Sequence, residues 1–255
     1  MSLRPVAVIP SRYAAQRFPG KPLALLHGKP MVQHVYERCV EAKCFERVVV
    51  ATDDERIAAV VRGFSGEVAM TSATCASGTD RVAEVARASS APADAVFVNV
   101  QGDEPAIHPE SLTILARAFG DASVEMGTLI RPLLEAERSN PNVVKVVLDE
   151  SGHALYFSRA DIPFQRDASG PPPPRWAHLG IYGYRKATLL RIAGLAPTAL
   201  EKSESLEQLR AMGHGVRIVC CVTKHSSTAV DVPADVPLAE AALDALPLPL
   251  GRGRG

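Results

Sequence analysis

The sequence predicts an α/β fold with a mostly parallel sheet covered by helices on both faces. Two observations predict this fold. Apolar runs rich in Val and Ile alternate with helical patterns along the first hundred residues, and this rhythm is typical of a parallel sheet. The runs also lack the polar alternation of half-exposed strands, as expected for strands buried on both faces. The length of 255 residues suits one large domain.

The first four strands and the helices between them are defined by local patterns. Asp53 or Asp54 can cap the second helix, and Ser77 or Thr79 can cap the third. Apolar side chains recur at helical spacing between the strands. The strands are expected at residues 5–10, 46–52, 66–71 and 94–100, and the helices within residues 29–42, 53–64 and 77–89.

The second half of the chain predicts further strands, one long helix and an irregular loop. Thr198 followed three residues later by Glu201 forms a capping-box pattern, and Gly213 ends the helix predicted over 198–213. Four consecutive prolines exclude regular structure from 167–177 and predict a surface loop. The further strands are expected at residues 124–132, 142–149, 153–159, 178–184 and 216–222.

The overall composition limits the classes of partner. Lys and Arg total 28, as do Asp and Glu, so the chain lacks the basic excess typical of proteins that bind nucleic acid or anionic membranes. It has neither a signal-peptide pattern nor an apolar stretch long enough to span a bilayer, which predicts a soluble cytoplasmic protein. The five cysteines lack the spacing of zinc sites. They predict reduced, mostly buried thiols, with a functional thiol as the alternative.

The loop after the first strand gathers three cations, Arg12, Arg17 and Lys21. In doubly wound sheets, ligands bind beyond the carboxyl ends of the strands, and the first strand-to-helix loop often binds phosphate. The loop is not a Walker loop, because Pro22 follows its Gly-Lys pair, and it contains no dinucleotide-type glycine fingerprint. It predicts a local anion site. The alternative is a solvated loop whose charges cluster without a ligand.

Acidic residues follow two other apolar runs. Asp103 and Glu104 emerge after the fourth strand, and Asp231 follows a later strand-like run. Mg²⁺ is usually held by one or two carboxylates together with substrate phosphates. The alternative for each acid is a helix cap. With the cationic loop, these acids would form a nucleoside-triphosphate and magnesium site, although spacing alone does not show that they meet.

Other catalytic patterns are weak. His178 lies in an apolar, buried strand pattern, where a structural histidine is at least as common as a ligand or base. The sequence contains neither a His-Glu-x-x-His motif nor a Gly-x-Ser-x-Gly elbow, which argues against common hydrolase mechanisms.

A series of motifs covers most of the chain, from Val6 to about Asp235. In order, they are IPSRYAAQRFPGKPL, VVVATDDERIA, SGTDRVAEV, VNVQGDEP, NPNVVKVVLDESGHALYFSRADIPF, HLGIYGYR, LEKSESLEQLR and AVDVPADV. In these motifs the sequence resembles the 3-deoxy-manno-octulosonate (Kdo) cytidylyltransferases, also called CMP-Kdo synthetases.

The resemblance implies a Rossmann-like, mixed and mostly parallel sheet of the nucleotide-diphospho-sugar transferase type, with a smaller sheet-and-helix lobe for substrate binding and dimerisation. It implies Mg²⁺-dependent transfer of CMP from CTP to Kdo, and a homodimer. One nucleotidyltransferase domain would fill residues 1–255. Its parts would be a CTP-binding part at about 1–130, an acid-binding and dimerisation part at about 131–225, a C-terminal return at about 226–245 and a disordered tail at 246–255.

Site residues follow from the matching motifs. The resemblance implies that Arg12, Lys21 and Asp103 are catalytic and that Asp103 and Asp231 bind Mg²⁺. The nucleotide would be held by Arg12, Arg17, Lys21, Arg81 and Gln101, with Gln101 reading cytosine. The sugar acid would face Arg159, His178, Tyr182 and Gln208.

Some segments depart from the family pattern on the acceptor side. The loop 167–177 is shorter, the segment LEKSESLEQLR lacks an Ile and a Met usual in the family, and SSTAVDVPAD lacks glycines beside the metal aspartate. The acceptor could therefore be amino-Kdo, another sugar acid or a small phosphonate such as phosphonoformate. A catalytically inactive CTP-binding regulatory protein is a further alternative. A glycosyltransferase would need an Asp-x-Asp metal motif, which QGDEP does not supply.

Overall fold

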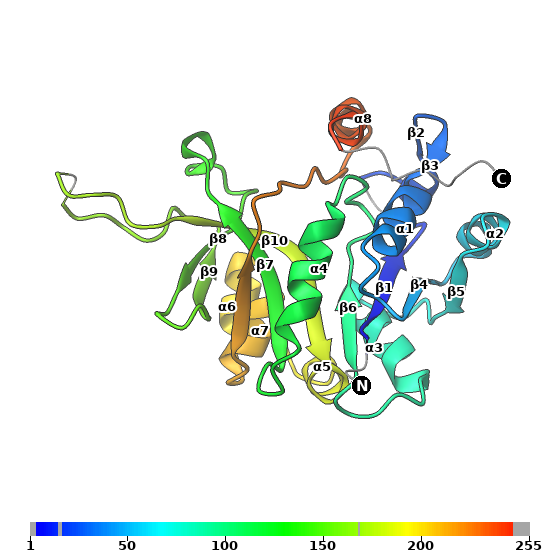
Figure 1. The fold of residues 1–255 in the computed structure, drawn as a ribbon, viewed down its shortest axis with the longest axis horizontal. Coiled ribbons are helices and arrows are strands. Elements are labelled where there is room, and N and C mark those ends of the chain that lie inside the picture. Colours follow the sequence, from blue (N-terminus) through cyan, green and yellow to red (C-terminus); the bar gives the residue numbers. More distant parts are fainter. Residues whose placement is uncertain (1–3, 15–16, 168, 247–255) are drawn as a thin grey trace.

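A nine-stranded sheet runs through the computed structural model, which describes residues 4–14, 17–167 and 169–246. Within this part of the chain the main strand order is β11-β7-β10-β6-β1-β4-β5, and β8 and β9 extend the sheet beside β10. Helices cover both faces (Figure 1). The α/β fold class predicted from the sequence is confirmed.

The first half of the chain forms the parallel part of the sheet. β1 pairs in parallel with β4 and β6, and β4 pairs in parallel with β5. All four strands predicted in this half are present within about one or two residues of their expected ends. Their bounds are β1 (Val6–Ser11), β4 (Arg47–Thr52), β5 (Glu67–Met70) and β6 (Val96–Asn99).

The second half of the chain supplies the antiparallel part of the sheet. β10 pairs antiparallel with β6, β7 and β8, while β11 pairs in parallel with β7. The strands are β7 (Met126–Pro132), β8 (Lys145–Leu148), β9 (Ala154–Ser158), β10 (Trp176–Arg185) and β11 (Ile218–Val222). A separate two-stranded hairpin is formed by β2 (Leu25–Leu26) and β3 (Lys29–Pro30).

Successive residues of β1 point into two different cores. Ala7 and Ile9 pack with residues of α1, α2 and α4, whereas Val8 packs with residues of α3, α5 and α7. This follows from the two-residue period of a strand. The helices are α1 (Met31–Glu41), α2 (Glu55–Gly63), α3 (Gly78–Ala88), α4 (Pro109–Ala118), α5 (Lys186–Ala193), α6 (Ala199–Glu204), α7 (Gln208–Gly213) and α8 (Val236–Asp244), with short 3₁₀ turns η1 (Lys21–Leu23), η2 (Glu135–Glu137) and η3 (Pro233–Asp235).

The expected caps are present at two early helices. Asp54 accepts a hydrogen bond from Arg56 N at the start of α2, and Ser77 forms a capping box with Asp80 at the start of α3. Among the described helices, none is long and apolar enough to cross a membrane.

The single long helix predicted over 198–213 is wrong, because two short helices occupy this segment. α6 begins at the predicted Thr198–Glu201 capping box but ends at Ser205, whose φ of 53° is left-handed. Arg159 Nε donates to the carbonyl oxygen of Glu204 at 2.7 Å, which a continuous helix would offer to the backbone amide four residues later. The break between α6 and α7 therefore coincides with this long-range hydrogen bond from Arg159.

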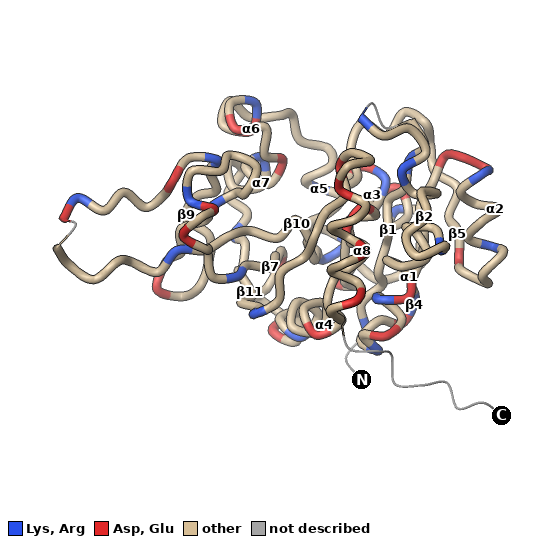
Figure 2. The backbone as a smooth tube through the Cα atoms, turned by 90° about the horizontal axis from the view of Figure 1, so that it is seen from above, with Lys and Arg blue, Asp and Glu red and all other residues tan. Residues whose placement is uncertain are grey.

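Residues 159–167 and 169–175, here called the arm, extend away from the body between β9 and β10 in two perpendicular views (Figures 1 and 2). The predicted irregular loop falls in this segment, except that Trp176 and Ala177 begin β10. Asp161 joins the base of the arm to Arg138 at 2.8 Å and to Arg175 at 2.5 Å. The predicted disordered tail lies outside the described residues from position 247 onward.

Basic and acidic residues are interspersed along the chain, as Figure 2 shows. The anion site that the sequence predicts is therefore a local feature.

Candidate active site

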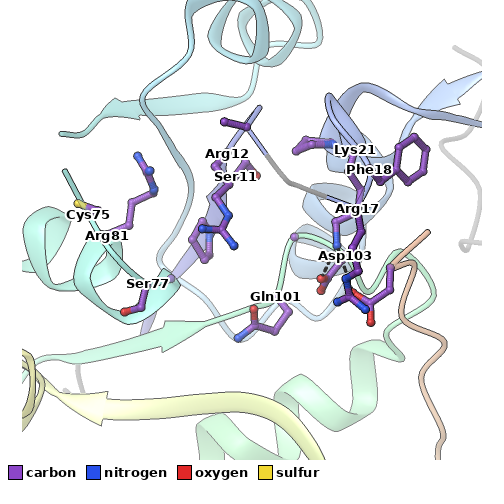
Figure 3. Close-up of a pocket in the computed structure, with 16 residues that line it drawn as sticks. Ser11, Arg12, Arg17, Phe18, Lys21, Cys75, Ser77, Arg81, Gln101 and Asp103 are labelled. Atoms are coloured by element: carbon purple, nitrogen blue, oxygen red, sulfur yellow. Dashed lines mark hydrogen bonds and ion pairs between the residues drawn. The ribbon is translucent and has the colours of Figure 1, made fainter. Parts of the chain in front are cut away.

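A cavity of about 590 Å³ lies at the carboxyl ends of β1 and β6 (Figure 3). It contains every residue that the sequence assigned to the nucleotide or to the metal. Its charged and amide-bearing lining residues are Arg12, Arg17, Lys21, Arg81, Gln101, Asp103 and Asp231. Spacing in the sequence left open whether the acids and cations meet, and the structure brings them together.

The parallel register of β1 and β6 places the two main loops of the cavity side by side. Val8 of β1 is paired with Asn99 of β6, so both chains leave the sheet at the same edge. A Cβ atom at Gly102 would lie 2.8 Å from the carbonyl oxygen of Pro10, closer than real Cβ contacts allow. Glycine at 102 therefore permits the close approach that sets Asp103 against the cationic loop.

Two of the three cations of the first loop, Arg17 and Lys21, bind the two carboxylates directly. Lys21 Nζ lies 2.7 Å from Asp103 Oδ2 and 3.7 Å from Asp231 Oδ1, and Arg17 Nη2 lies 3.0 Å from Asp231 Oδ1. The Val230 amide donates to the carbonyl oxygen of Asp103 at 2.9 Å. This bond holds the C-terminal return against the fourth-strand loop, so two carboxylates far apart in sequence face one ammonium group.

Arg81 and Gln101 occupy another wall of the cavity. Arg81 is 3% exposed on α3, and its guanidinium donates to Thr71 Oγ1 and lies 3.4 Å from Asp53 Oδ1. These partners hold a buried cation beside the first turn of α3, where Ser77 and Gly78 line the same cavity. Gln101 Nε2 donates to the carbonyl oxygen of Gly180 at 3.0 Å, which fixes the orientation of its amide.

A smaller cavity of about 40 Å³ adjoins the first at Gln101 and contains two predicted acceptor residues, Tyr182 and Gln208. The Tyr182 hydroxyl, Gln208 Nε2 and Asn99 Oδ1 are buried there without a hydrogen-bond partner. Buried polar atoms are normally paired. Three unpaired polar atoms beside one cavity therefore mark a place for a polar ligand.

Glu207 in the same small cavity was missed by the sequence analysis. Ser77 Oγ and Thr79 Oγ1 donate to its two carboxylate oxygens at 3.1 and 3.0 Å. Burial raises the pKa of Glu207, and the two hydroxyl donors oppose that rise. The only sequence signal was its position beside Gln208 in the motif LEQLR, and the strand residue Asn99 gave no signal at all.

The structure places Arg159 and His178 outside the residues that line these two cavities. Besides Glu204, Arg159 donates to the carbonyl oxygen of Pro141 at 2.9 Å. His178 Nε2 lies 3.0 Å from Thr128 Oγ1, and its ring packs between those of Phe157 and Tyr182. Burial lowers the pKa of His178 to about 3, so the ring is neutral. The role of both residues in acceptor binding stays a prediction.

Glu104 and the cysteines have surroundings that the sequence left open. Glu104 does not cap α4, because His108 performs that role. Burial, followed by the nearby charge of Asp103, raises the pKa of Glu104 to about 7.

All five cysteines are free, and Cys75 lies at the wall of the larger cavity. Burial raises the pKa of Cys75 to about 11, which disfavours a reactive thiolate.

Comparison with known proteins agrees with this geometry. A family model described as cytidylyltransferase matches residues 6–218. The chain belongs to the cytidylyltransferase family. It is 54% identical over 244 residues to the 3-deoxy-manno-octulosonate cytidylyltransferase of Myxococcus xanthus (strain DK1622), covering 96% of this chain and 98% of that relative. A relative with the same description from Syntrophotalea carbinolica is 52% identical over 250 residues, covering 94% and 98%.

Two solved structures share the fold. A CMP:2-keto-3-deoxy-manno-octonic acid synthetase complexed with CTP is 40% identical, with a TM-score of 0.89 and coverage of 94% of this chain and 98% of that one. A 4-diphosphocytidyl-2C-methyl-D-erythritol synthase is 17% identical, with a TM-score of 0.65 and coverage of 96% and 100%, and shows the fold alone. The nucleotidyltransferase type of fold expected from the sequence is confirmed.

Proposed function

We propose that this cytidylyltransferase transfers CMP from CTP to Kdo, giving CMP-Kdo and pyrophosphate. The observation that carries the proposal is the single cavity in which four cations, two carboxylates and Gln101 converge. Its support comes from relatives that are named for this activity at about 50% identity and from a similar structure that holds CTP.

The proposed chemistry is an in-line displacement at phosphorus. The anomeric hydroxyl of Kdo forms a bond to the α-phosphorus of CTP, the bond from that phosphorus to the bridging oxygen breaks, and pyrophosphate leaves with the electron pair. The hydroxyl proton passes to solvent. Catalysis of this kind depends on positioning and on stabilising the negative charge of the transition state. Lys21 and Arg12 would stabilise that charge, and Arg17 would hold the triphosphate.

The carboxylates fit a role in binding Mg²⁺. Asp103 and Asp231 offer hard oxygen donors that approach the same Lys21 ammonium, so a cation already lies between them. Mg²⁺ prefers such oxygens, together with phosphate and water. We infer that these two residues hold it, with Lys21 turning to the phosphates. When bound, Mg²⁺ supplies Lewis-acid stabilisation of the phosphate oxygens.

The small cavity is the proposed entrance to the acceptor site. Its unpaired amide, carbonyl and hydroxyl groups suit the hydroxyls of a sugar acid, and Glu207 can accept a hydrogen bond from one of them. Arg159 and His178 would join the acceptor site only after the segments around β9 and β10 rearrange. In this structure other protein groups hold both side chains.

We also propose that the protein acts as a homodimer in the cytoplasm, where CTP is available, and that its product serves lipopolysaccharide biosynthesis. Large apolar side chains are exposed on the second half of the chain, with Leu134 61%, Leu155 60% and Phe164 87% exposed. Leu25, Val40 and Met70 of the first half are at least half exposed as well, but less than these three. A group of exposed large apolar side chains favours a protein contact. A second copy of the lobe is the occupant that we propose.

The test of the function is pyrophosphate release by the purified chain with CTP and Mg²⁺. We expect release with Kdo, none with UTP or ATP, and loss of release when a chelator removes the metal. Amino-Kdo, sialic acid and phosphonoformate belong in the acceptor panel, because the acceptor segments differ from the family pattern. Release with another acid alone would change the acceptor and keep the chemistry. CTP binding without release for any acid would favour the regulatory alternative.

A further inference from the structure

Three side chains with metal-binding atoms meet at the start of α4, outside both cavities described above. His108 is the N-cap residue of α4, Glu110 lies in the first turn of this helix, and His225 lies in the return segment between β11 and η3. Their candidate ligand atoms all lie within 4.8 Å of one another. This group, here called the His-Glu-His cluster, joins two elements that are more than a hundred residues apart in sequence.

The cluster is already closely packed. His225 Nε2 lies 2.8 Å from Glu110 Oε2, and the rings of His108 and His225 stack with centroids 3.4 Å apart and planes 3° from parallel. Two imidazolium rings at this distance would repel each other. Burial, followed by the neighbouring His225, lowers the pKa of His108, so its ring is held in the neutral form that binds metals.

We propose that His108, Glu110 and His225 bind one divalent cation of the zinc class. Two imidazole nitrogens and one carboxylate oxygen are a donor set that zinc and its transition-metal neighbours accept, whereas Mg²⁺ prefers oxygen donors alone. The cluster borders a cavity of about 380 Å³ that is also lined by Ser226 and Thr228. Water in that cavity can fill the remaining coordination position.

Metal binding requires one of the two rings to turn out of the stack, because an imidazole nitrogen binds an ion in the plane of its own ring and two parallel rings cannot share such an ion. The other competing contacts are readily exchanged. Lys224 Nζ is 3.9 Å from Glu110 Oε2 and its side chain is 78% exposed, so it can move into solvent when a metal binds. His108 Nδ1 accepts a hydrogen bond from the Glu110 amide at 3.2 Å. A cation bound at that nitrogen replaces the amide hydrogen, and because Glu110 is exposed its amide can bond to water instead.

The position of the cluster gives the ion a structural consequence. The return segment is tied to α4 by a buried hydrogen bond between Ser111 Oγ and Thr223 Oγ1 at 2.8 Å. Seven residues further on, the Val230 amide binds the carbonyl oxygen of Asp103. An ion at His225 would fasten the chain between these two points, directly before Asp231 in the larger cavity.

Zinc binding by the full chain tests the proposal. His108→Asn keeps a side chain suited to capping α4, and His225→Gln keeps an amide that can donate to Glu110. Equilibrium dialysis against ZnCl₂ compares the wild type with both single variants and the double variant. We expect the wild type to bind one more Zn²⁺ per chain than the double variant, and each single variant to bind that ion at least about tenfold more weakly.

Ions at the active-site carboxylates or the cysteines contribute equally to all four proteins, so the difference isolates the cluster. With Co²⁺ as the probe, visible absorption from nitrogen and oxygen coordination should appear in the wild type and be absent from the double variant. Equal stoichiometry and affinity in the wild type and the single variants would overturn the proposal. The single variants keep the test decisive if the double variant fails to fold.

Discussion

The nucleotide cavity and the lobe around β8, β9 and the arm differ in how completely their side chains are satisfied. In the cavity, Lys21, Asp103, Asp231 and Arg17 already bind one another. In the lobe, large apolar side chains face solvent, and the adjoining small cavity holds polar atoms without partners. Most charged groups of the first region therefore pair with one another, whereas the described residues of the second region leave apolar side chains exposed and polar atoms unpaired.

This difference predicts which measurable properties depend on the nucleotide cavity and which depend on the lobe. Reaction chemistry should be sensitive to single charges in the nucleotide cavity. Acceptor binding and assembly should depend on the lobe and its neighbouring helices. Three variants test this division, and a fourth, at His178, tests the packing of a residue that the sequence assigned to the acceptor.

Asp103→Asn should have the largest effect. Removing the carboxylate deprives Lys21 of its nearest partner and the proposed metal of a ligand, so the turnover of CTP should fall by at least about 10². The free energy of unfolding should change by less than about 1 kcal/mol, since the ion pair is partly exposed. Pyrophosphate release and urea denaturation measure the two quantities. Asp94→Asn, an exposed carboxylate outside the cavity, is the control, and turnover near the wild-type rate in Asp103→Asn would contradict the assignment.

His178 should make stability depend on pH. Its folded pKa of about 3 lies below the ordinary histidine pKa of 6.5, so the unfolded chain binds the proton more readily and stability falls as the pH drops below about 6.5. At about pH 5, protonation of His178 in the unfolded chain lowers the free energy of unfolding by about 2 kcal/mol. The variant His178→Gln should lose less stability than the wild type between about pH 7 and about pH 5, measured by denaturant unfolding.

His214→Gln, which replaces an exposed histidine, should keep the wild-type pH dependence. If His178→Gln also keeps it, then the ring of His178 accepts a proton in the folded state, and its neutral packing against Phe157 and Tyr182 is wrong.

Glu207→Gln should separate acceptor binding from nucleotide binding. The substitution keeps the size of the side chain but removes the charge that Ser77 and Thr79 now donate to, and charged hydrogen bonds contribute about 1.5–3 kcal/mol. We expect kcat/KM for Kdo to fall about tenfold while the Kd for CTP stays unchanged. Steady-state kinetics and CTP titration measure these values. A weaker affinity for CTP alone would assign Glu207 to the nucleotide cavity.

Leu155→Ser should have the smallest effect, confined to assembly. If the exposed Leu155 lies in the proposed contact between two copies, its truncation should weaken dimerisation about fivefold, a loss of about 1 kcal/mol. Sedimentation equilibrium measures the dissociation constant. Met70→Ser is the matched control, because Met70 is 50% exposed on β5 at the other end of the sheet. A wild-type chain that stays monomeric at assay concentrations would contradict the dimer.

Local patterns predicted most of the fold. Strands such as β1 and β4 are apolar at nearly every position because both faces of the sheet are covered, and that property is visible in the sequence without knowledge of contacts. The prediction of one helix over 198–213 was wrong for the opposite reason. Its break at Ser205 accompanies a contact from Arg159, which is about 45 residues away, and no pattern within the segment records that contact.

The residues of the candidate site also divide into those that carried a signal in the sequence and those that did not. Lys21 and Asp103 carried signals of their own, since a charged loop directly after a buried strand is unusual. The resemblance to a family supplied Arg81 and Gln101. Asn99 resembled any other residue of a buried strand, and only the unpaired amide oxygen beside the small cavity distinguishes it.

The ion pairs in the nucleotide cavity also govern how the protein attracts its ligand from a distance. Among the described lining residues, four cations face two carboxylates, which leaves a net charge of +2 when all are ionised. A triphosphate approaching from solvent therefore meets about half the field that the cations alone would produce, over a screening length of about 8 Å at physiological ionic strength. The rate of CTP capture should thus vary only modestly with added salt, and the full strength of the cations becomes available only after arrival, as they exchange carboxylates for phosphates.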